Sequence, residues 1–126
     1  MKIVVLDKPR ENPGEIDWSA LYELGEVEMN DRVLQKDILA HIEDADVVLL
    51  NKSNLTRDIL EKCKNLKFIS VIATGYNTVD FVAARELGIP VSNVPSYGTE
   101  GIGQHAFALL MEITNHVGYH DAEVRK

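Results

Sequence analysis

The sequence predicts an α/β domain with an open, mostly parallel sheet of five strands and helices on both of its faces. Five short apolar segments alternate along the chain with segments of helical periodicity. The apolar segments are continuous, as is typical of parallel strands that are buried on both faces. The 126 residues are enough for one domain with a core of its own.

The five strands are expected at residues 2–6, 26–29, 46–50, 66–73 and 90–94. The first, third and fourth segments are rich in β-branched and other apolar residues, which favours buried strands. The second segment is more polar, because glutamates alternate with Val27 and Met29. It is therefore expected at a more exposed place in the sheet.

Helices are expected at residues 18–24, 34–42, 56–63, 80–87 and 99–117, and a turn-rich stretch with Pro9 and Pro13-Gly14 precedes the first of them. Asp17 is the expected N-cap of the first helix and Gly25 its end. Gly88, followed by the apolar Ile89, is typical of a glycine C-cap after the fourth helix. Apolar residues cover most of the circumference of the last helix.

Five alternating strands and helices in a chain of this length predict a flavodoxin-like sheet. Ligands of such sheets bind beyond the carboxyl ends of the strands. This rule selects four loops as candidate sites, at residues 7–8, 51–54, 74–77 and 95–99.

Composition excludes several classes of partner. The net charge of −7 and the lack of a basic cluster argue against nucleic acid and anionic membrane surfaces. No apolar stretch approaches the ~20 residues that a membrane-spanning helix needs. The single cysteine, Cys63, forms neither an internal disulfide nor a zinc cluster, which favours a reducing, cytoplasmic environment.

The stretch VIATGYNTVD contains the most informative of the four loops, where a buried strand ends at Thr74, Gly75, Tyr76 and Asn77. Glycine permits a positive φ and lets a ligand approach the backbone closely. Successive N–H groups before a helix can form a nest for an anion such as a carboxylate. From residue types alone an ordinary strand-to-helix turn remains the more frequent explanation, and both interpretations stay open at this point.

The segment IATGYNTVDFVAARELGIPVSNVPSYGTEGIGQHAFALLMEIT resembles the first domain of the D-isomer-specific 2-hydroxyacid dehydrogenases. The order and spacing of its motifs match that family over residues 66–118, and MKIVVLD and DADVVLLNKS fit the preceding part. The resemblance covers essentially the whole chain. It is nearest to the branch of glycerate dehydrogenase and hydroxypyruvate reductase.

The resemblance implies a site for a small anionic 2-keto or 2-hydroxy acid. In that family the glycine loop binds the substrate carboxylate through backbone amides, which implies Thr74 and Gly75 here, with Tyr76 and Asn77 beside them. The remaining residues that it implies are Lys52 and Ser53 near the far end of the substrate, and Tyr97, Gly98 and Thr99 near the nicotinamide.

The resemblance also implies what these residues do not supply. The family takes its NAD or NADP site, its catalytic arginine, its acid and its paired histidine from a dinucleotide-binding domain that follows the long helix. No residue of this sequence matches them, so residues 1–98 are expected to be a substrate-binding domain and 99–126 a helix that leads to the absent domain. We expect this fragment to be inactive and to bind no cofactor by itself, and to form a homodimer through residues 99–117.

Two further patterns carry little functional weight. GTEGIG reverses the order of the GxGxxG fingerprint and lies at a helix start, so a structural role for its glycines is favoured. His116 and His120 have a spacing that suits a metal, but no third ligand is evident, and a solvated helix face is favoured. His105 matches a position that is often histidine in the family, but it is not the catalytic histidine.

A receiver-like signalling domain is the alternative from another functional class, since receivers share this length and element order. Phosphoryl transfer there needs a pair of acids, an aspartate acceptor and a lysine. Asp7 stands alone, Asn51 takes the place of the acceptor, and no lysine follows the fifth strand. An interaction domain without catalysis therefore stays open as the alternative.

Overall fold

The computed structural model describes residues 1–8 and 16–126. The turn expected around Pro9 and Pro13-Gly14 lies outside the described residues. The chain divides into two compact units, Met1–Pro95 and Ser96–Lys126, and each is described by itself.

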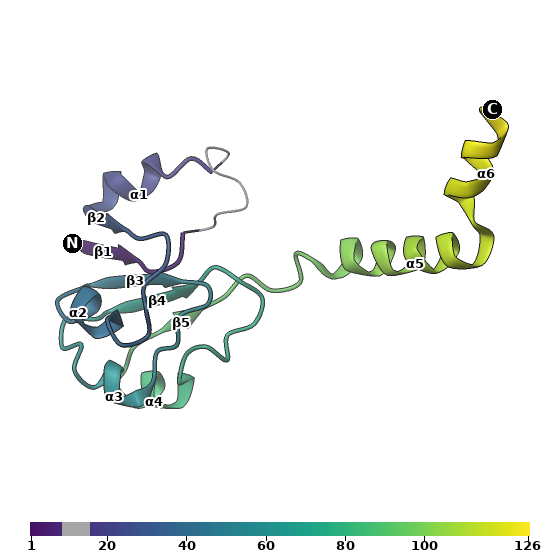
Figure 1. The fold of residues 1–126 in the computed structure, drawn as a ribbon. Helices are drawn as coiled ribbons and strands as arrows, with labels where there is room; N and C mark the ends of the chain where they lie inside the picture. Colours follow the sequence, from purple (N-terminus) through teal and green to yellow (C-terminus); the bar gives the residue numbers. More distant parts are fainter. Residues whose placement is uncertain (9–15) are drawn as a thin grey trace. The chain divides into compact units, whose positions relative to one another are not determined.

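The first unit is built on a sheet of five strands in the order β2-β1-β3-β4-β5 (Figure 1). The strands are β1 (Lys2–Val5), β2 (Glu26–Met29), β3 (Val47–Leu50), β4 (Phe68–Val71) and β5 (Val91–Ser92). All four pairings are parallel, and Val48 of β3 lies opposite both Val4 and Ile69. This strand order is that of flavodoxin-like sheets, which confirms the predicted fold class.

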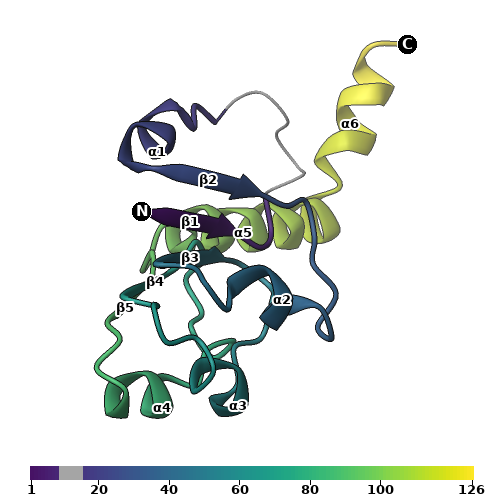
Figure 2. The same cartoon turned by 90° about the vertical axis from the view of Figure 1, so that its left-hand side faces the viewer.

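The helices of this unit are shorter than predicted: α1 (Ser19–Leu24), α2 (Ile38–Ile42), α3 (Arg57–Leu60) and α4 (Phe81–Glu86). Helices α2, α3 and α4 lie on one side of the sheet and α1 lies on the other (Figure 2). The main core joins Ile38, Leu60 and Ala84 from the three helices to Val48 and Ile69 of the sheet. A smaller cluster on the opposite face packs Trp18 and Leu21 against the sheet residues Ile3, Val5 and Leu49.

Both ends of α4 follow from its sequence. Asp80 accepts a hydrogen bond from the backbone N–H of Ala83 at 2.9 Å, which is the geometry of an N-cap. Gly88 has a φ of 72°, and the N–H groups of Gly88 and Ile89 donate to the carbonyls of Arg85 and Ala84. This pair of bonds is a Schellman motif, so the predicted glycine C-cap is confirmed.

The first helix begins one residue later than its predicted cap implied. Trp18 occupies the N-cap position, while the Asp17 carboxylate accepts a hydrogen bond from the N–H of Ser19 at 2.9 Å. Gly25 ends the helix as predicted. It must be glycine for a steric reason, because a Cβ there would collide with the carbonyl of Met1.

The second unit consists of α5 (Thr99–Asn115) and α6 (Val117–Val124). His116 separates them with left-handed dihedrals, φ 48° and ψ 46°. The Glu112 carboxylate accepts the N–H of Gly118 at 3.1 Å and so satisfies a free donor at the start of α6. The helix predicted over residues 99–117 thus ends two residues early, and the break at His116 between α5 and α6 was not predicted.

Two classes of site can be assessed over the described residues. None of the helices in residues 1–8 and 16–126 is both long and apolar enough to cross a membrane. Within the same residues, no three His, Cys, Asp or Glu side chains are grouped so that they could hold a metal ion.

The buried thiol of Cys63 gives a first test of the core. Its side chain is 4% exposed, and burial, with a smaller contribution from Glu43, raises the pKa of Cys63 to about 11. At pH 8 only about one thiol in a thousand is therefore ionised, and the thiolate is the reactive form. We expect Ellman's reagent to modify the folded protein at least ~100-fold more slowly than the urea-unfolded chain. Equal rates in the two states would contradict the buried position of Cys63.

Candidate functional site

Three of the four loops selected by the sequence follow neighbouring parallel strands of the first unit. Asp7 lies just beyond β1, residues 51–54 follow β3, and residues 74–77 come after β4. Because parallel strands end at the same edge of a sheet, the three segments lie along one edge.

The Asp7 carboxylate is the most heavily bonded polar group at this edge. One of its oxygens accepts the backbone N–H groups of Asn51, Lys52 and Ser53 at 3.1, 2.9 and 2.7 Å. The other oxygen accepts the Ser53 hydroxyl at 2.9 Å. Asp7 is only 8% exposed and Ser53 only 6%. The loop after β3 is therefore a backbone nest that the protein fills with its own carboxylate.

These bonds decide the protonation of Asp7. Burial by itself would raise the pKa of the Asp7 carboxyl, because it disfavours the charged form. The hydrogen bonds from Ser53, Asn51 and Lys52 outweigh burial and hold the pKa of Asp7 below its ordinary value. Asp7 is thus negatively charged in the folded protein, and both of its carboxylate oxygens accept hydrogen bonds from the loop after β3.

A second side chain completes the anchoring of this loop. Gln35 donates its amide to the carbonyl of Asn54 at 2.9 Å and accepts the N–H of Asn54 at 3.3 Å. Every backbone N–H from Asn51 to Asn54 is therefore bonded within the protein. Lys52 projects its side chain from this fixed backbone and is exposed.

The loop after β4 presents the opposite situation. Residues 74–77 are all exposed. Their N–H groups donate no hydrogen bond to any acceptor within residues 1–8 and 16–126. The loop is held instead through its carbonyl side, since the Asn93 side chain donates to the Thr74 carbonyl at 2.8 Å. Val94 N–H donates to the Ala73 carbonyl at 3.0 Å. Four successive amides thus remain available to a ligand.

The backbone of Gly75 corrects one expectation. Among the described glycines, Gly25 and Gly88 have positive φ and Gly75 does not. A Cβ at Gly75 would lie 3.2 Å from the side-chain oxygen of Asn77, which is a tight contact. A larger residue here would therefore require the Asn77 side chain to shift, and no left-handed conformation calls for glycine.

Shallow cavities adjoin these loops. One of about 220 Å³ is lined by Asp7, Arg32, Lys52 and their neighbours, and a second of about 460 Å³ includes Asn77 and Thr78. Gln35 and Asn54 line both cavities, so the two cavities adjoin each other between the loop after β3 and the loop after β4. Among the described residues, the hydroxyl of Thr78 is the one buried side-chain polar atom without a hydrogen-bond partner.

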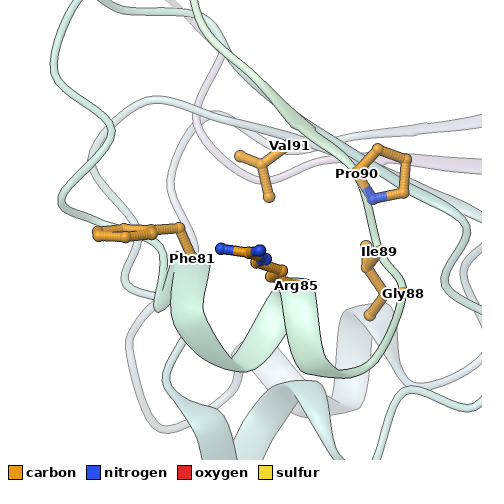
Figure 3. A pocket seen from close by; sticks show the side chains of 6 residues that line it. All are labelled: Phe81, Arg85, Gly88, Ile89, Pro90 and Val91. Atoms are coloured by element: carbon orange, nitrogen blue, oxygen red, sulfur yellow. The ribbon is translucent and has the colours of Figure 1, made fainter.

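A larger cavity lies away from these loops. It has a volume of about 540 Å³ and is lined by Phe81, Arg85, Gly88, Ile89, Pro90 and Val91 (Figure 3). Gly88, Ile89 and Pro90 precede β5, so the cavity opens near the amino end of that strand. This position is away from the carboxyl edge, where ligands of parallel sheets bind.

The remaining predicted residues belong to the second unit. Tyr97 is exposed, Gly98 is the N-cap of α5, and Thr99 is its first residue. Gly101 and Gly103 lie inside the first turns of α5 and not in a strand-to-helix turn. The sequence contains no GxGxxG, and among the described residues the loops after β3 and β4 offer no phosphate-binding turn of that kind. The residues present do not fit a dinucleotide.

Comparison with known proteins decides the family. Residues 3–120 match the family described as D-isomer specific 2-hydroxyacid dehydrogenase, catalytic domain. The chain belongs to this family. A hydroxypyruvate reductase from Blautia hydrogenotrophica is 50% identical over 100% of the chain. Family membership confirms the resemblance and decides against the receiver-like alternative.

Solved structures of oxidoreductases share this fold. An acyclic imino acid reductase (Bsp5) in complex with NADPH and D-Arg has a TM-score of 0.79 at 26% identity, over 99% of this chain and 41% of that one. An NAD-dependent formate dehydrogenase from Staphylococcus aureus in complex with NAD has a TM-score of 0.69 at 27% identity, over 99% and 41%. The chain likewise spans 40% of the length of the Blautia relative.

Sequence reasoning found the loops of this dehydrogenase domain but missed the side chains that shape them. The sequence placed Asp7 in a candidate loop but did not predict that it would bind the loop after β3, and it indicated no role for Gln35 or Asn93. A signal existed for Asp7, since an acid directly after a buried strand needs a partner. Ser53 was predicted beside the substrate, and its hydroxyl is bonded to Asp7.

The Asp7 bonds give a test of stability. We expect Asp7→Asn to lower the free energy of unfolding by roughly 2–3 kcal/mol at pH 7, because an amide cannot accept all four donors. The folded pKa of Asp7 is lowered, so its stabilisation is complete above the unfolded value of ~3.9 and is lost as the pH falls through the folded value. Urea unfolding at pH 7 and pH 3 measures both effects.

Asp37→Asn is the matched control, since Asp37 makes no side-chain cap bond at the start of α2. It should change stability by less than ~0.5 kcal/mol. An Asp7→Asn protein as stable as the control at pH 7, or a difference that grows at pH 3, would contradict the role of the carboxylate.

Proposed function

We propose that the first unit is the substrate-binding domain of an NAD(P)-dependent oxidoreductase. The enzyme interconverts hydroxypyruvate-like 2-keto acids and glycerate-like D-2-hydroxy acids. The observation that carries the proposal is the pair of neighbouring loops, one with its amides filled by Asp7 and the other with its amides open. The relative named hydroxypyruvate reductase supports the substrate class.

The open loop binds the substrate carboxylate. Thr74 and Gly75 donate their N–H groups at the centre, and Tyr76 and Asn77 lie beside them. A carboxylate held by several amides needs no cation in direct contact, since each bond to an anion is stronger than a neutral one. This local attraction matters because the chain carries a net charge of −7 and its overall field does not draw anions in.

The loop at residues 51–54, whose amides are already bonded to Asp7 and Gln35, lies near the far end of the substrate. Lys52 supplies a cation from a backbone that Asp7 and Gln35 hold in place. Ser53 contributes by fixing this loop through its bond to Asp7, and not through a free hydroxyl. A fixed backbone lowers the entropy lost when the substrate is ordered.

NAD or NADP, bound by another domain of the intact enzyme, supplies or accepts the hydride. Tyr97, Gly98 and Thr99 lie near the nicotinamide. The residues of this chain orient the substrate but transfer neither hydride nor proton, so residues 1–126 by themselves bind substrate without turnover. The cytoplasm is the compartment that suits a nicotinamide-dependent reductase with one reduced cysteine.

The long helix of the second unit pairs with a second copy of the chain. None of the 17 residues of α5 is buried, and large apolar side chains follow its length: Ile102, Phe107, Leu110, Met111 and Ile113. An exposed apolar surface of this extent marks an interaction site.

Titration of the ¹⁵N-labelled chain tests the carboxylate site. We expect D-glycerate or hydroxypyruvate to shift the amide signals of Gly75 and Tyr76, with a dissociation constant on the order of millimolar, because the catalytic arginine of the family is not among these residues. Glycerol, which lacks the carboxylate of D-glycerate, is the matched control and should leave both signals in place. If saturating D-glycerate moves neither signal, or glycerol moves them equally, the proposal is wrong.

Light scattering tests the pairing of α5. We expect a dimer mass for the chain and a monomer mass for Leu110→Glu, because a buried charge in an apolar contact is strongly unfavourable. Val124→Glu is the matched control on α6, where the side chain is 87% exposed, and should remain dimeric. A strictly monomeric mass of the unsubstituted chain at high concentration would contradict the dimer.

A further inference from the structure

We propose that Asn93 is a positioning residue that sets the direction of the Gly75 N–H, the central donor for the substrate carboxylate. The inference rests on the proposed function of the loop at residues 74–77. Asn93 itself does not touch the substrate. It acts through the peptide group between Thr74 and Gly75.

The contact is made outside the regular sheet. The ladder between β4 and β5 pairs Ile69 with Val91 and Ser70 with Ser92. Beyond it, the Asn93 side-chain amide donates to the Thr74 carbonyl at 2.8 Å. The N–H of the next residue, Val94, donates to the Ala73 carbonyl at 3.0 Å. The adjacent carbonyls of Ala73 and Thr74, where β4 leads into the glycine loop, are therefore held by two adjacent residues after β5.

Because the peptide group is planar, the hydrogen bond to the Thr74 carbonyl also fixes the direction of the Gly75 N–H. The Thr74 carbonyl and the Gly75 N–H belong to one peptide group, and in a trans peptide they point in opposite directions. No peptide bond among the described residues is cis. Once Asn93 draws the Thr74 oxygen to itself, the Gly75 N–H must point away from Asn93. No acceptor within the described part of the chain receives that N–H.

The hydrogen bond from Asn93 is needed because Gly75 makes the loop backbone flexible. Gly75 has no Cβ to restrict its dihedrals, and the loop around it is exposed. Without an external restraint the peptide between Thr74 and Gly75 can rotate, and the amides would have to be ordered at the moment of binding. Asn93 is half-buried and lines a cavity of about 230 Å³ with Tyr76, Phe81 and two residues of β5. Asn93 directly follows β5, so the edge strand determines its place.

Two substitutions of Asn93 distinguish the role of its hydrogen-bond donor from the role of its side-chain shape. Asn93→Ala removes the donor, and we expect the dissociation constant for D-glycerate to rise roughly five- to tenfold, the value of about one hydrogen bond. Asn93→Asp keeps the shape but offers only acceptor oxygens to the Thr74 carbonyl, so we expect a larger loss. Asn65→Ala and Asn65→Asp are matched controls, because Asn65 is exposed in the segment that precedes β4. Both should bind as the unsubstituted chain does.

The direction of the donor is measured without ligand. Residual dipolar couplings of the backbone amides report the orientation of each N–H. We expect the coupling of Gly75 to change in Asn93→Ala and Asn93→Asp, while the couplings of β4 residues stay the same. A merely structural role of Asn93 would disturb β4 and β5 together and leave no selective change at Gly75.

The outcomes are distinguishable. If the unsubstituted chain does not bind D-glycerate, the proposed function fails, and the ligand-free couplings still decide the role of Asn93. If the chain binds and Asn93→Ala binds equally well with an unchanged Gly75 coupling, the inference is overturned. Asn93→Ser, which keeps a shorter donor, replaces Asn93→Ala if that variant does not fold, and it should weaken binding by more than the Asn65 controls do.

Discussion

Asp7 accepts the amides of the loop after β3, and this interaction determines which backbone donors at the edge of the sheet remain open. Two neighbouring parallel strands end here in loops that present successive N–H groups. In one loop a buried carboxylate with a lowered pKa takes three of these groups and a hydroxyl. In the other, at residues 74–77, the amides keep no partner within the described residues. An incoming carboxylate therefore meets one open nest and one that is already filled.

This arrangement suits the binding of an acidic substrate, as we propose, by an acidic protein. With a net charge of −7, long-range attraction of an anion is weak, and short-range bonds to oriented amides must supply the affinity. When the loops are already fixed, little conformational entropy is lost in orienting these amides as the ligand binds. Asp7 and Gln35 fix one loop, and Asn93 with Val94 fixes the other. In the proposed function, specificity for the carboxylate thus rests on residues that do not touch it.

Structural features that depend on neighbouring residues along the chain could be predicted from the sequence. Apolar segments located four strands, alternation of glutamates with Val27 and Met29 located β2, and Gly88 with Ile89 marked the end of α4, because these signals depend on neighbours along the chain. The partners of Asp7 lie 44 to 46 residues away, and their proximity depends on the strand order. The bond from Asn93 to Thr74 depends likewise on β5 lying beside β4. The break at His116 escaped prediction because a left-handed residue other than glycine leaves little trace in sequence.

The central claim is that the open amides of residues 74–77 hold the carboxylate of a 2-hydroxy acid. A crystal structure of the chain grown with D-glycerate tests it most directly. The account predicts carboxylate oxygens within about 3 Å of the Gly75 nitrogen and of an adjacent amide nitrogen in the loop, with the rest of the ligand directed toward Lys52. A carboxylate bound through Lys52 alone, with the amides of the glycine loop still facing solvent, would contradict it.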